Sequence, residues 1–139
     1  MTLYYVGIDG GGTSCRARIR DDQGTLIGEA KSGSANILLG VDVAMSSIVD
    51  AITQAAQQGQ LDSNHFSNIH VGLALAGAEQ KSAWFDFMAQ PHPFASMTLN
   101  TDAYGACIGA HNGQNGAIMI GGTGSCGIYL QDGEQHVVC

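Results

Sequence analysis

Charged side chains are scarce in this chain of 139 residues, of which only 12% are Asp, Glu, Lys or Arg. Positive charge is the rarest: five Lys and Arg stand against twelve Asp and Glu, which gives a formal net charge of -7. An acidic chain without a basic patch is a poor candidate for nucleic acid or an anionic membrane, so we expect neither as a partner. Any bound phosphate is expected to be held by backbone N–H groups and a metal ion.

Cysteine pairs and long apolar runs are also missing. The four cysteines form no C-x-x-C pair, so they are expected to be buried free thiols of a reducing cytosol. Asp9 interrupts the N-terminal apolar run, which argues against a signal peptide, and no segment is long enough to span a membrane. The expected location is the cytoplasm. The histidines show no metal-ligand spacing and are expected to be structural: His65, His70, His92, His111 and His136.

Glycine is abundant, with 20 residues, and two glycine loops each follow a strand-like apolar run. Glycine allows tight turns in which several N–H groups point at one anion, and φ > 0 is expected at Gly11 and Gly12. Two such loops facing each other would form a phosphate clamp. The predicted phosphate-binding residues are Gly10, Gly11, Gly12 and Thr13 in the first loop, and Gly121, Gly122, Thr123, Gly124 and Ser125 in the second.

The second loop has an alternative interpretation, because residues 122–127 also match the dinucleotide-binding pattern G-x-G-x-x-G. That pattern requires a helix to begin at the loop and an acidic residue about 20 positions later. Here residues 127–130 are β-like and Asp132-Gly133 is a hairpin signal, so a phosphate loop between strands is favoured. The chain has no G-K-[ST] motif, which excludes a P-loop.

Two carboxylates stand beside these loops. Asp102 lies between them in sequence and could take a proton from an alcohol; the structural alternative is an N-cap of the following helix. Asp9 comes directly before the first glycine loop and is the candidate Mg²⁺ ligand, acting through water because magnesium keeps much of its hydration shell.

The apolar pattern predicts an α/β fold. Three meander strands lead into strands connected by helices, which predicts a mixed sheet covered by helices. Arg16, Arg18 and Arg20 alternate along the second strand and are expected on one solvated face. Strands are expected at 3–8, 13–20, 25–30, 69–75, 97–101, 117–120, 127–130 and 135–138, and helices at 41–58, 79–89 and 103–110.

Three motifs in this order, at residues 9–13, 101–106 and 120–125, resemble the actin-like ATPase superfamily of sugar kinases, Hsp70 and actin. Within it the chain is most similar to the BadF/BadG/BcrA/BcrD-type group, which includes N-acetylglucosamine kinase and bacterial glucosamine kinase. The resemblance implies a ribonuclease H-like lobe with a mixed five-stranded sheet over residues 1–112. Residues 113–139 would then begin a second, similar lobe. Members of the group are longer, and the part that this chain lacks carries the adenosine-binding motif, so the resemblance implies a fragment.

The resemblance further implies an ATP-dependent kinase that phosphorylates the 6-hydroxyl of glucosamine or N-acetylglucosamine, with Mg²⁺ as metal and Asp102 as general base. Ala76 stands where some relatives have a serine. The isolated chain is expected to be inactive and to form a homodimer or self-associate through residues 115–139. The implied sugar contacts are Asn36, Gly77, Asp102 and Thr123.

Two alternatives remain open at this point. One is an ATPase activator of a 2-hydroxyacyl-CoA dehydratase, which carries an iron–sulfur cluster. In those proteins the second glycine loop typically continues with Gln-Asp, where this chain has Thr123-Gly124. The other is a non-catalytic sugar-sensing module. The sequence does not discriminate between glucosamine and N-acetylglucosamine.

Overall fold

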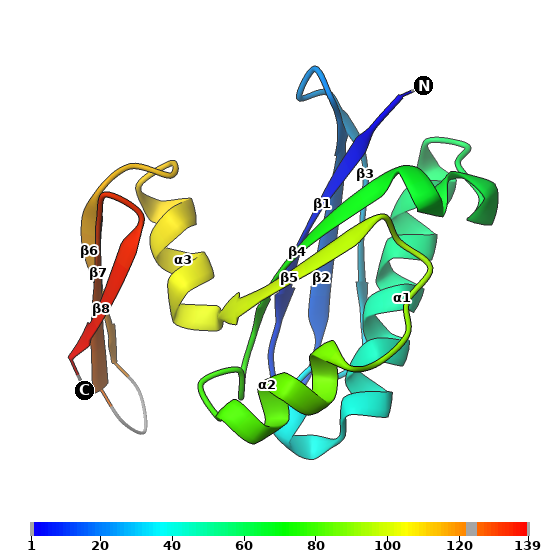
Figure 1. Ribbon diagram of the computed structural model, residues 1–139. Helices are drawn as coiled ribbons and strands as arrows, with labels where there is room; N and C mark the ends of the chain where they lie inside the picture. Colours follow the sequence, from blue (N-terminus) through cyan, green and yellow to red (C-terminus); the bar gives the residue numbers. More distant parts are fainter. Residues whose placement is uncertain (1, 122–124, 139) are drawn as a thin grey trace.

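A computed structural model of the chain describes residues 2–121 and 125–138. It contains two β-sheets with a helix between them (Figure 1). The strands are β1 (Tyr4–Gly10), β2 (Cys15–Asp21), β3 (Leu26–Ser32), β4 (Ile69–Leu75), β5 (Ser96–Thr101), β6 (Gly116–Gly121), β7 (Ser125–Gln131) and β8 (Glu134–Val138). The helices are η1 (Ile37–Leu39), α1 (Val41–Gln58), η2 (Ser63–Asn68), α2 (Lys81–Met88) and α3 (Asp102–Ala110).

The first sheet has five strands in the order β3-β2-β1-β4-β5. Strand β2 runs antiparallel to both of its neighbours, whereas β1, β4 and β5 are parallel. The predicted mixed five-stranded sheet with flanking helices is therefore confirmed. Antiparallel strands need only a hairpin, whereas each parallel connection contains a helix, because the chain must return to the starting end of the sheet.

One face of this sheet is buried beneath α1. Alternate residues of β1, Val6 and Ile8, point into this core, while the residues between them are exposed. Helix α1 approaches β3 so closely that a Cβ at Gly28 would overlap the Ala55 carbonyl. The buried side of α1 consists of small and branched residues at helical spacing: Ala44, Ile48, Ala51, Ile52, Ala55 and Ala56.

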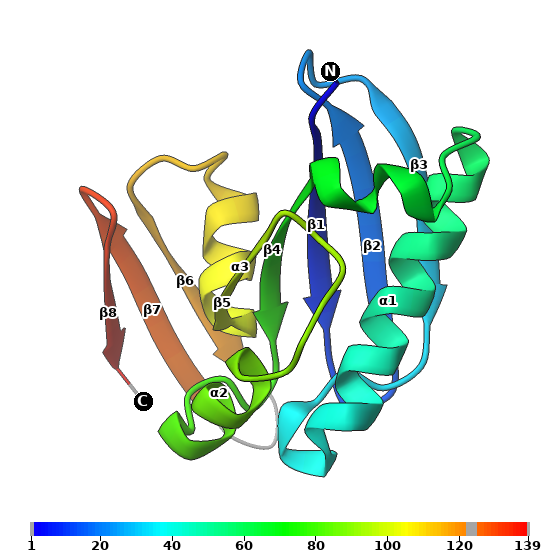
Figure 2. The same ribbon diagram turned by 45° about the vertical axis from the view of Figure 1, so that its right-hand side comes forward.

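Helix α3 lies between the two sheets (Figures 1 and 2). On one side, Gly105 packs so tightly on Ala74 of β4 that a Cβ would overlap the alanine side chain. On the other side, Cys107 packs with Ile128 and Leu130 of β7 in a small second core. The second sheet has the order β6-β7-β8, and both of its pairings are antiparallel.

The structure differs from the sequence predictions mainly at element ends. The second strand begins at Cys15 rather than residue 13, because residues 11–14 form the turn between β1 and β2. The second helix is limited to Lys81–Met88, because the residues before it form a turn. Helices η1 and η2 were not predicted, because a 3₁₀ turn is too short to show a periodic pattern.

Two predictions from composition concern cysteine and the membrane. Cys15 and Cys107 are free and buried, as expected, and burial raises the pKa of the Cys15 thiol. The side chains of Cys126 and Cys139 lie outside the described residues. No helix in the described part of the chain is both long and apolar enough to cross a bilayer.

Candidate active site at the strand ends

The segments that carry the predicted site residues leave the first sheet at one edge. Strands β1, β4 and β5 are parallel, and β3 points in the same direction because it is separated from β1 by the antiparallel β2. Their carboxyl ends therefore lie together (Figure 1). Ligands of α/β sheets characteristically bind outside the carboxyl ends of the strands. The segments at this edge are residues 11–14, 33–36 and 76–80, and Asp102.

The three glycines of the first loop do different things. Gly10 is buried, and a Cβ there would lie 2.6 Å from Leu75 Cδ2, so close packing requires glycine at this position. The Gly11 N–H donates to the Ser14 carbonyl at 2.9 Å. Gly12 and Thr13 are exposed, and no other part of the described chain takes their N–H groups. These two N–H groups are the ones available to an anion.

The prediction of positive φ angles in this loop is wrong. None of Gly10, Gly11 and Gly12 is among the glycines with φ > 0. A Cβ at Gly12 would meet no atom within 4 Å, so neither backbone strain nor crowding within the chain requires glycine there. Glycine at position 12 does leave room for a bound ligand to come close to the backbone.

Backbone hydrogen bonds join the first glycine loop to both predicted sugar segments. The Ala35 N–H donates to the Gly11 carbonyl at 3.0 Å, and the Ala76 N–H donates to the Gly10 carbonyl at 2.9 Å. The Ile37 N–H in turn donates to the Ala76 carbonyl at 3.2 Å. The three segments therefore form one connected unit, although they are far apart in sequence.

Asn36 and Gly77, the predicted sugar contacts, are brought together at this edge. Gly77 has φ 90°, and a Cβ there would lie 2.9 Å from Asn36 Oδ1 and 2.8 Å from Leu38 Cγ. Beside them, the buried Ser34 hydroxyl has no hydrogen-bond partner within the described residues. Sequence reasoning missed Ser34, because a serine in a glycine-rich loop carries no signal of its own.

Asp102 is the first residue of α3 and is exposed. The predicted alternative, in which Asp102 is the N-cap, is wrong: the cap is Thr101, whose Oγ1 accepts from the Tyr104 N–H at 3.1 Å. Asp102 Oδ1 accepts from the Ala103 N–H at 2.9 Å. That bond orients the carboxylate, and its second oxygen remains available to a ligand.

Asp9 is exposed on the sheet face opposite α1, in register with Arg16 of β2 and Ala74 of β4. No group of three or more His, Cys, Asp or Glu that could enclose a metal occurs in the described part of the chain. A single carboxylate fits Mg²⁺, which is usually held by one or two carboxylates plus water and phosphate oxygens. Asp9 therefore suits the predicted role of a ligand acting through water.

The second glycine loop follows β6, but Gly122, Thr123 and Gly124 lie outside the described residues. Their predicted contacts with phosphate and sugar stay predictions. The backbone at its borders is clear, because Gly121 ends β6 and Ser125 begins β7. A strand rather than a helix follows the loop, so the dinucleotide-binding alternative is excluded.

A groove of about 920 Å³ runs along the uncovered face of the first sheet beside α3 and meets the strand-end edge at Asp9. Lys31 aligns with Arg16 in the β2–β3 register, and Arg18 is bonded to Glu29 at 3.0 Å. Arg16, Arg18 and Arg20 alternate along the exposed face of β2, as predicted, and Lys31 lies on the same face. Asp9 and Glu29 lie there too, so this face carries charges of both signs. The β2–β3 register places Lys31 on the same face as Arg16, and the residues around Lys31 in sequence did not predict this position.

Known proteins resemble this chain in both sequence and fold. A glucosamine kinase, GspK, of Vibrio cholerae serotype O1 is 74% identical over 135 residues, which cover 97% of this chain and 46% of that relative. A candidate N-acetylglucosamine kinase of Chromobacterium violaceum superimposes with a TM-score of 0.88 at 34% identity, over 97% of this chain and 48% of the other. The chain thus spans about half the length of these relatives.

More distant structures share the fold. Component A of the (R)-2-hydroxyglutaryl-CoA dehydratase of Acidaminococcus fermentans has a TM-score of 0.54 at 13% identity, over 98% of this chain and 47% of its own.

Residues 6–138, nearly the whole chain, match the BadF/BadG/BcrA/BcrD ATPase family. The motifs, the sheet topology and these matches agree, and the chain belongs to the BadF/BadG/BcrA/BcrD ATPase family.

Proposed function

We propose that the protein is an ATP-dependent kinase of an amino sugar, glucosamine or N-acetylglucosamine, that acts on the 6-hydroxyl. The observation that carries this proposal is the edge at which the first glycine loop, the Asn36–Gly77 pair and Asp102 meet. A relative 74% identical to this chain is named a glucosamine kinase, which supports the same substrate class.

Asp102 would act as the general base. Its free carboxylate oxygen accepts the proton of the sugar hydroxyl while the hydroxyl oxygen attacks the γ-phosphorus. The bond between that phosphorus and the bridging oxygen breaks, and ADP leaves with the electron pair. Positioning and electrostatic stabilisation dominate phosphoryl transfer, so the residues mainly hold the two reactants in line.

The first glycine loop would bind phosphate oxygens of ATP through the N–H groups of Gly12 and Thr13, and the second loop would do so from the opposite side. Mg²⁺, held by Asp9 through water, would neutralise charge on the phosphates. Residues 1–112 would form the N-terminal lobe and residues 113–139 the start of a second lobe, with ATP bound between them. Such chemistry fits a cytoplasmic protein, because ATP is made and used there.

The direct test is an ADP-release assay on the full-length protein with Mg²⁺ and ATP, using glucosamine, N-acetylglucosamine and glucose as acceptors. We expect turnover with one or both amino sugars well above that with glucose, and a product carrying phosphate on the 6-oxygen by NMR. Binding of an amino sugar without any ADP release would instead indicate a sugar sensor. The absence of both binding and turnover with either amino sugar would exclude the proposed substrate class.

A further inference from the structure

His111 connects the end of α3 to the beginning of β6. Its Nε2 lies 2.9 Å from the Ala117 carbonyl oxygen, which can only accept, so Nε2 carries the hydrogen and donates it. The imidazole ring also covers Gly116 so closely that a Cβ at that position would overlap the ring. One side chain of the helix terminus thus contacts two consecutive residues of the strand.

Other contacts at the same place support a fixed junction. The His111 N–H donates to the Cys107 carbonyl at 3.2 Å, and the Gly113 N–H donates to the Ile108 carbonyl at 2.9 Å, which closes the last turn of α3. The Cys107 thiol lies 3.5 Å from the Gly116 carbonyl oxygen. Asn112 and Gly113 have φ of 52° and 79°, and this left-handed pair reverses the chain.

The reversal makes β6 run back along α3 (Figure 1). A nine-residue helix is about 13 Å long, and a strand of six residues spans about 20 Å. The carboxyl end of β6, at Gly121, therefore lies at or beyond the level of the first turn of α3, where Asp102 stands. Helix α3 and strand β6 meet near His111. The far end of α3 carries the candidate base Asp102, and the far end of β6 is Gly121, where the second glycine loop begins.

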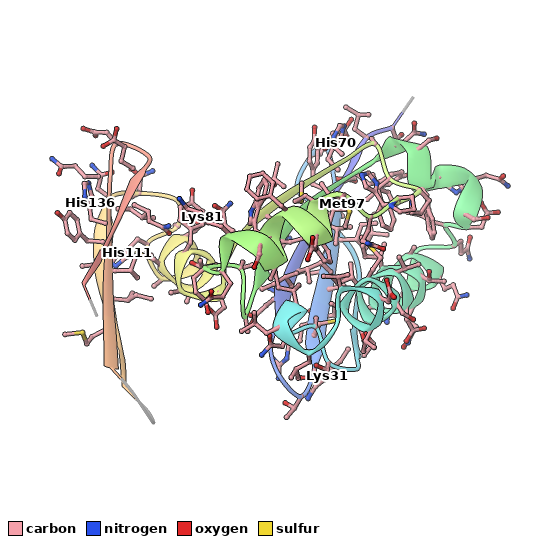
Figure 3. All side chains as sticks on the ribbon, turned by 60° about the horizontal axis from the view of Figure 1, so that its bottom comes forward. Lys31, His70, Lys81, Met97, His111 and His136 are labelled. Carbon is pink, nitrogen blue, oxygen red and sulfur yellow. The ribbon has the colours of Figure 1, made fainter. Side chains whose placement is uncertain are left out.

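The direction of β6 relative to α3 decides how far apart these two ends lie. A small change of direction at the first residues of β6 displaces its other end, Gly121, by more than it displaces Gly116. Helix α3 itself is held against the first sheet by the Gly105–Ala74 contact. Ile118 of β6 packs into the small core around Cys107 of α3, so the strand stays against the helix beyond its contacts with His111. Figure 3 labels His111 at this junction beside β6.

We propose that His111 is a positioning residue of the kinase reaction, which holds the start of β6 against the end of α3 and thereby sets where the other end of β6, the predicted phosphate-binding residue Gly121, lies relative to Asp102. This inference rests on the proposed function. His111 touches neither the sugar nor ATP in this scheme. Its loss is expected to affect the transition state, in which base and phosphate loop act together, more than the binding of either substrate alone.

The test compares four variants of the full-length protein. His111→Phe keeps a ring over Gly116 but removes the donor, whereas His111→Gln restores a donor at the position of Nε2. Gly116→Ala pushes the ring away. Gly109→Ala, whose new Cβ would meet no atom within 4 Å, is the matched glycine control in α3. For each variant, kcat and the KM of both substrates are measured, together with amide hydrogen exchange of residues 116–121.

We expect His111→Phe and Gly116→Ala to lower kcat by about 10-fold or more with small changes in KM, because misplacement by an ångström can cost that much. Exchange in residues 116–121 should become faster in both. His111→Gln and Gly109→Ala should stay within about 3-fold of the wild-type kcat, a difference below 1 kcal/mol.

Two results would overturn the clamp: wild-type kcat and exchange in His111→Phe, or a His111→Gln variant as impaired as His111→Phe. If a substitution prevents folding, the double variant His111→Ala/Gly116→Ala tests the contact instead. Removing the His111 ring should relieve the overlap that Gly116→Ala creates. A wild-type protein that phosphorylates no amino sugar would refute the proposed function. Hydrogen exchange would still report on the clamp in that case, so the two failures are distinguishable.

Discussion

Asn36 Oδ1 accepts a hydrogen bond from the Leu38 N–H at 2.9 Å and so caps η1. A backbone N–H needs an acceptor, so this contact fixes which end of the side-chain amide faces the protein. The Nδ2 group is the end left for a ligand. Asn36 Nδ2 therefore offers hydrogen-bond donors to the proposed sugar.

Replacing Asn36 separates these two roles. Asn36→Asp keeps an oxygen to cap η1 but removes the donors, so we expect near wild-type thermal stability with sugar affinity lowered by about 10-fold or more. Asn36→Ala should lose sugar affinity and also about 1 kcal/mol of stability through the lost cap. Calorimetric titration with the amino sugar and thermal unfolding measure the two effects. An Asp variant that binds sugar as the wild type does would remove Nδ2 from the site.

Gly10 and Gly12 should respond to substitution in opposite ways. Gly10→Ala would crowd Leu75 and Ala35, so it is expected to lower stability by about 1–3 kcal/mol. Gly12→Val has open space around it and should leave stability nearly unchanged, while the side chain obstructs phosphate and weakens ATP binding. Thermal unfolding and ATP titration on both variants provide mutual controls. Unchanged ATP affinity in Gly12→Val would count against the phosphate assignment.

Asp102 and its neighbour Thr101 offer a second matched pair. Asp102→Asn keeps an oxygen that can accept from the Ala103 N–H but cannot take a proton, so kcat should fall by about 10²-fold or more while the sugar still binds. Thr101→Val removes the helix cap and should cost about 1 kcal/mol of stability with little change in kcat. Steady-state kinetics and thermal unfolding separate the two. Turnover within a few-fold of wild type in Asp102→Asn would show that Asp102 is not the base.

The 139-residue chain on its own should self-associate through its second sheet and show no kinase turnover. Met119 of β6 is 79% exposed and Tyr129 of β7 is 40% exposed, and β6 is an outer strand of the described sheet. Exposed apolar side chains and open strand edges are association surfaces. Light scattering and a coupled ATPase assay test both expectations, with Met119→Lys as the variant that should associate less. A monodisperse monomer with hexosamine-dependent ATP turnover would contradict them.

The sequence predicted the fold well because its signals are local. The strand at residues 69–75 and the helix at residues 41–58 were predicted with the bounds that the structure shows, since alternation and helical spacing are set by which side chains face the core. The glycine loop conformation was predicted wrongly, because glycine permits φ > 0 without requiring it. The cap of α3 was misassigned by one residue, because Thr101 and Asp102 are both good capping residues and only geometry distinguishes them.

The sequence by itself determined the order of strands and helices, the candidate base Asp102 and the glycine segments, because each depends on a few neighbouring residues. Only the tertiary structure decided that residues 11–14, 33–36 and 76–80 form one hydrogen-bonded unit, and that Lys31 joins three arginines on one face. It also decided that His111 clamps Gly116 and Ala117. These relationships depend on strand order, register and the path of the turn between α3 and β6. These relationships are stabilised by packing between segments that are distant in sequence, so no local sequence pattern predicts them.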